Sequence, residues 1–226
     1  MLTRRQWLQG SAAALAAGLG QGPGWAQDNR SVIAARFGAL PARPGRVFAA
    51  GPPAGALLAV LAPQQLLGWP MQMSDAARTY LGPQLQALPY LGRLSGRGST
   101  LPLEKLLALQ PDLVLDSGTS DATHVSAAER LARQMGLACV LVQGSLPEHA
   151  RQLREVGALL GVAERGEILA RHADEAARLV RGVTAGLGQE ARPRVYLGRG
   201  ANGLETGLAG SINVEVIDYA GGRNVA

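Results

Sequence analysis

Short apolar runs alternate with helical segments along the chain, and this alternation restricts the fold more than any other feature. The run "DLVLD" (112–116) follows a helical segment, "LPLEKLLALQ" (101–110), that ends at Pro111. A further helical segment (126–136) leads to "ACVLV" (138–142), where apolar residues do not alternate with polar ones. Strands covered on both faces have this continuous apolar pattern, and strands joined through helices pair in parallel. We therefore predict an α/β fold built on a parallel sheet.

Two earlier apolar segments extend the same pattern. "RVFAA" (46–50) ends at a Gly-Pro-Pro turn, a helix is predicted over 54–63, and "LLGW" (66–69) is a further short strand. Residues 71–100 are predicted to form a loop with one helical turn. Together these segments predict an N-terminal α/β lobe over residues 46–144.

Long helices follow this lobe. They are predicted over 147–161, where Pro147 suits a first turn, and over 164–187. Apolar residues of the second helix step by four and three positions, as one continuous face requires: Leu169, Ala173, Ala176, Val180, Val183 and Leu187. About 24 residues give a rod of roughly 36 Å, longer than a usual crossover helix. We expect residues 145–190 to be linking helices between two lobes.

The last part of the chain resembles the opening of the first lobe. "RPRVYLG" (192–198) predicts a strand similar in sequence to residues 42–51, and "SINVEVIDYAGG" (211–222) predicts a helix. Residues 191–226 are therefore predicted to start a C-terminal α/β lobe. One strand and one helix cannot bury a core alone, so the second lobe is expected to be incomplete, as in a truncated two-lobed protein. The alternative is that both elements pack onto the first lobe.

Residues 1–26 have the pattern of an export signal. Arg4 and Arg5 precede a short Ala/Leu-rich run, and "GWAQ" provides the small residues that a signal peptidase needs, with cleavage near Ala26. The run is too short to cross about 30 Å of hydrocarbon. The paired arginines followed by Trp-Leu favour the twin-arginine route over an ordinary secretory signal. We expect a periplasmic protein in which residues 27–45 are a loose leader.

Charge and cysteine content argue against a nucleic-acid-binding protein and against a fold with an internal disulfide. The formal net charge is +5, and removal of the two arginines of the signal lowers it to +3. Basic residues are spread along the chain without runs of five or six, so we predict no nucleic-acid partner. The single cysteine, Cys139, lies in an apolar strand, which predicts a core residue and no internal disulfide.

Candidate motifs for catalysis or cofactor binding lack the residues or the surrounding sequence that such sites require. "GRGANG" (198–203) matches a dinucleotide-binding pattern, but the following "LETGLAG" has two glycines where the helix has to continue. "GRLSGRGST" (92–100) lacks the P-loop lysine. The histidines do not have metal-site spacing, although His124 lies beyond a strand end, where a ligand contact is one interpretation. No carboxylate pair suggests an acid and a base. We predict no enzyme, no catalytic residue, no cofactor and no metal site.

Position in the fold provides the remaining signal for function. Ligands of parallel α/β sheets bind beyond the carboxyl ends of the strands. Trp69 follows one predicted strand and can stack on a flat ligand. Arg199, near another strand end, can hold anionic groups through forked hydrogen bonds, together with Arg93 and Arg97 of the Gly-rich loop at 92–100. We predict these four residues as ligand contacts; the alternatives are a loop anchor for Trp69 and solvated surface charges for the arginines.

The order of these segments also resembles a known family. With "LEKLLALQPDLVLDSGT", the long helix and "GLETGLAGSINVEVIDYAGGRN", residues 43–226 are similar to the periplasmic substrate-binding proteins of iron-complex ABC importers. The resemblance implies two α/β lobes joined by one rigid helix, with the ligand in the cleft between them and little domain motion. It also implies that residues 116–118 form part of the cleft wall.

The resemblance further implies a ligand class and a partner. The family carries ferric siderophores, haem and cobalamin, and some relatives carry nickel complexes or molybdate. We therefore expect a monomer that binds a metal chelate and delivers it to an inner-membrane ABC permease, docking through acidic residues for which Glu129 and Glu215 are the candidates. The alternatives are another metal complex or an oxyanion as ligand, a secreted α/β enzyme, and a remnant that binds nothing.

Overall fold

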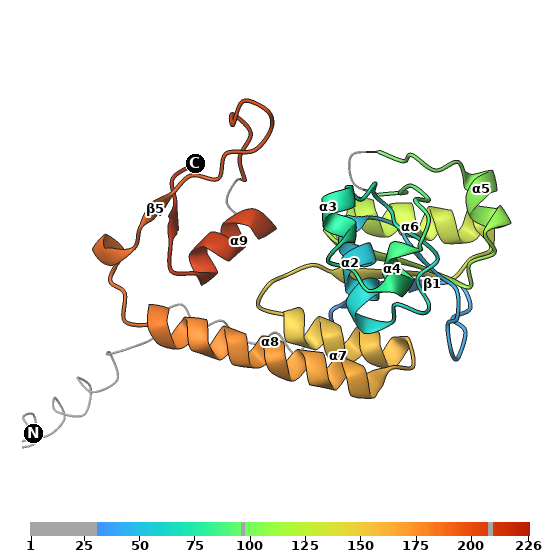
Figure 1. The fold of residues 1–226 in the computed structure, drawn as a ribbon, viewed down its shortest axis with the longest axis horizontal. Helices are drawn as coiled ribbons and strands as arrows, with labels where there is room; N and C mark the ends of the chain where they lie inside the picture. Colours follow the sequence, from blue (N-terminus) through green and yellow to red (C-terminus); the bar gives the residue numbers. More distant parts are fainter. Residues whose placement is uncertain (1–30, 96–97, 208–209) are drawn as a thin grey trace, which may run out of the picture. The chain divides into compact units, whose positions relative to one another are not determined.

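The computed structural model describes residues 31–95, 98–207 and 210–226 (Figure 1). Residues 31–226 form the unit that carries the described fold. The predicted export signal (1–26) and the predicted ligand contact Arg97 lie outside the described residues.

A sheet with parallel central strands organises the first lobe, as the sequence predicts. Within the described residues it has the order β1-β4-β3-β2. The strands β2 (Val47–Ala49), β3 (Leu113–Gly118) and β4 (Cys139–Gln143) pair in parallel. Their carboxyl ends therefore lie along one edge of the sheet. The segment at 66–69, predicted as a strand, instead contributes isolated bridges from Leu66 to Val47 and from Trp69 to Tyr90.

The edge strand β1 (Ile33–Phe37) was not predicted from the sequence. It pairs antiparallel with β4, with an irregular register between Ile33 and Ala35. Its side chains alternate between half-buried and exposed positions, so the run has no continuous apolar signal. A part of the segment interpreted as a loose leader is thus a strand of the sheet.

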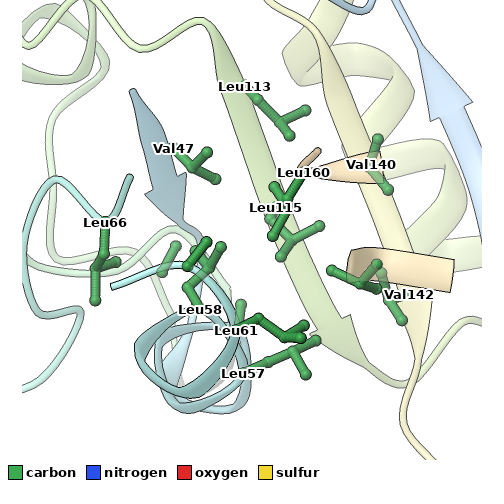
Figure 2. Close-up of a cluster of buried hydrophobic side chains, with 14 of the residues drawn as sticks. Val47, Leu57, Leu58, Leu61, Leu66, Leu113, Leu115, Val140, Val142 and Leu160 are labelled. Atoms are coloured by element: carbon green, nitrogen blue, oxygen red, sulfur yellow. The ribbon is translucent and has the colours of Figure 1, made fainter. Parts of the chain in front are cut away.

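Helices cover both faces of the sheet. Alternate strand residues belong to two separate apolar clusters, because successive side chains of a strand point to opposite faces. Val47, Leu115 and Val140 face the cluster that includes α2 and α7 (Figure 2). Phe48 and Val114 face the other cluster, which α5 and α6 complete. The helices of this lobe are α2 (Pro52–Leu61), α3 (Asp75–Arg78), α4 (Pro83–Gln86), α5 (Leu103–Ala108), α6 (Ala122–Met135) and α7 (His149–Leu159).

The long helix α8 (Ala163–Thr184) follows α7 and packs against it before continuing past its end (Figure 1). Its 22 residues correspond to a rod of about 33 Å. The contact face differs in part from the predicted one. Gly166 and Ala170 are buried, whereas Ala176 and Val183 of the predicted stripe are exposed. Leu169, Ala173, Val180 and Leu187 of the predicted stripe are half-buried, so the prediction was wrong at Ala176 and Val183.

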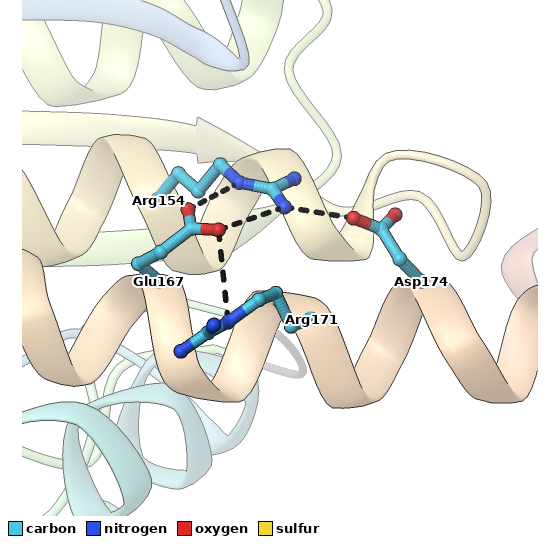
Figure 3. Close-up of polar contacts among 4 residues, drawn as sticks. All are labelled: Arg154, Glu167, Arg171 and Asp174. Carbon is cyan, nitrogen blue, oxygen red and sulfur yellow. Dashed lines mark hydrogen bonds and ion pairs between the residues drawn. The ribbon is translucent and has the colours of Figure 1, made fainter.

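Two glycines set the distance between α7 and α8. A Cβ atom added to Gly166 would lie 2.5 Å from the carbonyl oxygen of Leu153, and one added to Gly157 would lie 2.9 Å from the Cα atom of Gly166. Arg154 reinforces the contact from the solvent side, with Nε 2.7 Å from Glu167 and Nη2 2.8 Å from Asp174 (Figure 3). These ion pairs are exposed, so close backbone packing holds the two helices more than charge does.

The C-terminal elements form a second, smaller unit of secondary structure. A short helical turn, η1 (Gln189–Ala191), leads to β5 (Arg194–Val195), which pairs in parallel with β6 (Arg223–Asn224) across α9 (Ile212–Tyr219). The strand β6 was not predicted from the sequence. Gly221, at φ +82°, follows α9 and lies against the end of α8, where an added Cβ would be 2.7 Å from Thr184.

The packing of α7 on α8 leads to a testable prediction. Gly166→Ala should lower the free energy of unfolding by about 1–3 kcal/mol, because the added methyl group collides with backbone that cannot move alone. Gly182→Ala is the matched control on the same helix, since nothing lies within 4 Å of the added Cβ. It should stabilise the protein by up to about 1 kcal/mol through helix propensity. Urea unfolding of both variants measures the difference, and equal effects would contradict the proposed packing.

Candidate functional site

A pocket of about 900 Å³ opens at the carboxyl ends of the parallel strands. Its walls come from four parts of the fold. They are the start of α2, the segment after β3, the segment after β4 with the start of α7, and α9. Representative lining residues are Pro53, Leu57, Asp116, Ser120, His124, Ser145, His149, Ile212 and Val216. Residues 116–118, which the resemblance placed in a cleft wall, line this pocket.

Asp116 is the carboxylate of the pocket wall. Its Oδ1 atom accepts hydrogen bonds from the Ser95 hydroxyl (2.9 Å) and from the Ser117 backbone N–H (2.9 Å). Burial nevertheless raises the pKa of Asp116 above its ordinary value, since desolvation outweighs these bonds and the nearby charge of His124. A carboxyl group kept in such surroundings lowers stability at neutral pH, which is typical of a functional position.

The backbone around Asp116 is shaped to receive Ser95. The Ala50 carbonyl, at the end of β2, accepts hydrogen bonds from the backbone N–H groups of Leu94 (2.8 Å) and Ser95 (3.0 Å). At Gly51 an added Cβ would lie only 2.6 Å from the Ser95 hydroxyl oxygen. The end of β2, the loop at 94–95 and the end of β3 therefore converge on one carboxylate.

Two histidines at helix starts also line the pocket. His124 in α6 has Nδ1 2.7 Å from Oδ1 of Asp121, the residue that caps this helix. His149 begins α7, and its Nδ1 lies 3.1 Å from Oε1 of Gln152. The side-chain amide of Gln152 donates from Nε2 to the Gln143 carbonyl, so its Oε1 faces His149 and accepts. In this arrangement Nδ1 of His149 is the donor to Gln152.

The helix α9 closes one side of the pocket. Its Glu215 accepts hydrogen bonds from the Ser145 hydroxyl (3.0 Å) and from the Leu146 backbone N–H (2.8 Å), both in the segment after β4. This contact brings Ile212 and Val216, which remain half exposed, to the pocket wall. The site therefore uses residues from both ends of the described chain.

The structure does not bring the predicted ligand contacts together at this pocket. Trp69 is 5% exposed and packs in the apolar core, with Nε1 donating to the Leu85 carbonyl at 2.9 Å. Arg93 donates from Nε to the Gly98 carbonyl at 3.1 Å. Arg199 lies in a bridge whose backbone pairs with Glu205. None of these three residues belongs to the pocket lining.

The two predicted docking residues have different surroundings. Glu129 is on α6, 42% exposed in its side chain, and lies 3.5 Å from Arg133 one turn later. Glu215 is engaged inside the molecule through Ser145 and Leu146. Both residues are partly exposed, but the carboxylate of Glu215 is already hydrogen-bonded to the segment after β4.

Several pocket residues were missed from the sequence. His149 and Gln152 were not predicted as pocket residues, because periodicity alone does not show that α7 begins at the edge of the sheet. The available signal was positional: "QGSLPEH" (143–149) follows a buried strand, as "DSGTSD" (116–121) does. Polar segments after neighbouring parallel strands meet at the same edge.

Comparison with known proteins identifies the family. Residues 81–226 match the model of the periplasmic binding protein family, and the chain belongs to this family. A comparison with curated protein sequences gives no significant match. None of the described helices is long and apolar enough to span a bilayer.

Solved structures show the same fold. An ABC transporter solute-binding protein from Sulfurospirillum deleyianum aligns at a TM-score of 0.72 with 22% identity, over 83% of this chain and 58% of that one. The periplasmic vitamin B12-binding protein BtuF of Vibrio cholerae aligns at 0.62 with 22% identity, over 81% and 67%. The molybdate-binding protein MolA of Haemophilus influenzae, bound to molybdate, aligns at 0.62 with 18% identity, over 83% and 62%. The chain thus spans 58% of the length of the first of these structures.

The raised pKa of Asp116 predicts a pH dependence of stability. Between its ordinary value of 3.8 and the higher folded value, the folded state binds more protons than the unfolded state, so stability falls as pH rises through this window. Asp116→Asn should remove this contribution and raise the thermal midpoint at neutral pH, since Asn keeps an oxygen for Ser95 and Ser117. Thermal melts across pH, with the exposed Asp75→Asn as control, measure the effect. A lower midpoint for Asp116→Asn at neutral pH would contradict the prediction.

Proposed function

We propose that this protein is the exported solute-binding component of an ABC importer, which captures an iron complex such as a ferric siderophore or haem and delivers it to an inner-membrane permease. The observation that carries the proposal is the open pocket of about 900 Å³ at the carboxyl ends of three parallel strands. Pockets of this size suit an organic ligand, and this edge is where α/β sheets bind ligands. Membership of the periplasmic binding protein family supports both export and transport.

The pocket has an apolar wall and a polar wall, which suits a chelate with both apolar and polar surfaces. The start of α2 contributes an apolar wall that includes Pro53, Ala56 and Leu57. The segments after β3 and β4 contribute hydroxyl, amide, imidazole and carboxylate groups. His149 lines the pocket, and a neutral imidazole there could ligate a metal that the chelate leaves partly uncoordinated. An organic shell would rest on α2 while polar edges or the metal face the strand ends.

Other metal complexes remain candidates within the same class. Solved proteins of this fold are described as binding vitamin B12, haem and molybdate. A nickel chelate or cobalamin fits the same apolar and polar walls. We favour a binding role over catalysis, because the family is one of binding proteins and the strand ends converge on an open hollow.

The proposed delivery step needs a second lobe and a docking surface. We assign residues 46–144 to the first lobe, 145–190 to the linking helices and 191–226 to the second. The close packing of α8 on α7 supports a stiff link and a small lobe motion. Glu129 remains the docking candidate of the first lobe; Glu215 would first have to release Ser145 and Leu146.

Calorimetric titration of the protein tests the function. Ferric siderophores, haemin and cobalamin are the probes, and at least one should bind with a stoichiometry of one. Ala56→Trp fills the pocket from α2 and should weaken that binding at least about tenfold, or about 1.4 kcal/mol. Ala176→Trp, an equally exposed alanine on α8, is the matched control. Binding that both variants leave intact would place the ligand elsewhere, and absence of binding by all probes would contradict the function.

A further inference from the structure

We propose that Asp116 makes the pocket selective for ligands that present a cationic or hydrogen-bond-donating group to the ends of β2 and β3, and selective against oxyanions. The proposal rests on the proposed function and specifies which ligands the same pocket accepts. It assigns the choice of ligand to one carboxylate rather than to the arginines that the sequence suggested.

The carboxylate is held in a built site. Its Oδ1 atom takes the hydroxyl of Ser95 and the N–H of Ser117, each at 2.9 Å. Its Oδ2 atom has no hydrogen bond from any residue that the structure describes. Ser95 itself is fixed by the Ala50 carbonyl and fits only because residue 51 is a glycine. One oxygen thus orients the carboxylate, and the other remains for a ligand.

Burial makes this oxygen a strong acceptor. Desolvation raises the pKa of Asp116, which shows that its charge is poorly compensated by the groups around it. A cationic or N–H-bearing ligand would supply the missing compensation, and hydrogen bonds to a charged acceptor are the strong ones. A ligand anion about 5 Å away would be disfavoured by roughly a hundredfold at an effective dielectric constant of about 20.

The groups around Asp116 agree with this charge preference. Besides Asp116, the ionisable side chains that line the pocket within the described ranges are His124 and His149. A second carboxylate, Glu215, is held by Ser145 and Leu146, which belong to the pocket wall. Two carboxylates thus stand at or beside the pocket wall, together with the imidazoles of His124 and His149. Asp116 and Ser95 also line a neighbouring hollow of about 470 Å³, so the same carboxylate separates two cavities.

The proposed preference for cations over oxyanions would distinguish this chain from a protein of the same fold that binds an oxyanion. MolA of Haemophilus influenzae was solved with molybdate, a dianion. The 18% identity to that protein carries the fold alone, and the strand ends of this chain offer a carboxylate. We therefore expect this pocket to reject molybdate.

Calorimetry with two small probes of opposite charge tests the proposal. Hexaamminecobalt(III) is a cation with N–H donors and no exchangeable positions, so it reports charge and hydrogen bonding without metal ligation. The wild-type protein should bind it, and Asp116→Asn should weaken binding at least about tenfold. Asp75→Asn, an exposed aspartate on α3, should leave binding unchanged. Molybdate should not bind the wild type at concentrations that saturate with hexaamminecobalt(III).

The outcomes separate this proposal from the proposed function. If Asp116→Asn leaves the cation affinity unchanged, or if the wild type binds molybdate more tightly than the cation, the charge selection is overturned. A chelate that still binds in the Ala56-dependent manner would in that case leave the transport function standing. Asp116→Ser is a second variant, should the Asn variant not fold, and is expected to weaken cation binding equally.

Discussion

The parallel pairing of β2, β3 and β4 is the constraint on which the rest of the site depends. Because the three strands run in one direction, the segments after each of them emerge at a single edge of the sheet. Ser95, docked on the end of β2, and Asp116, at the end of β3, meet there although 21 positions separate them. The same edge receives His149 at the start of α7. The apolar faces of the strands keep this edge rigid, since helices cover both sides of the sheet.

The backbone contact between α7 and α8 is the second constraint on the site. Gly157 and Gly166 allow the two helices to approach closely, so α8 leaves the first lobe in a direction fixed by packing. The C-terminal elements use its far end: Gly221 lies against Thr184, and α9 then reaches the segment after β4 through Glu215. The pocket wall that α9 supplies thus depends on two glycines that do not line the pocket. The close contact between α7 and α8 therefore influences the shape of the pocket at the sheet edge.

The sequence predicted the fold better than it predicted the site, for physical reasons. Continuous apolar runs mark β3 and β4, because burial of both faces needs such runs. The side chains of β1 alternate between half-buried and exposed positions and include the polar Arg36, so the sequence has no continuous apolar run there. This strand also depends on β4 for its pairing. Trp69 was predicted from its place after a strand, but its indole is held by the Leu85 carbonyl, a partner that only the folded loop provides. The histidines need Asp121 and Gln152 to orient them, and Gln152 depends in turn on Gln143. Position near a strand end correctly placed Asp116 at the pocket, because β3 carries this residue toward the sheet edge. The same signal failed where a loop could fold back, as at Trp69.

Apart from Leu57, the described residues that line the pocket are not members of the apolar core. Buried strand residues such as Leu113 and Leu115 are 0% exposed and contribute apolar area that favours folding. Asp116 is one residue further along the same strand and opposes folding at neutral pH, because its charge is partly desolvated. Gly51 gives up a side chain so that Ser95 can reach this carboxylate. A sequence selected for stability alone would replace the carboxylate with a neutral side chain and close the hollow beside it. The charge of Asp116 and the open pocket are both explained if a cationic or hydrogen-bond-donating group of the ligand compensates this charge.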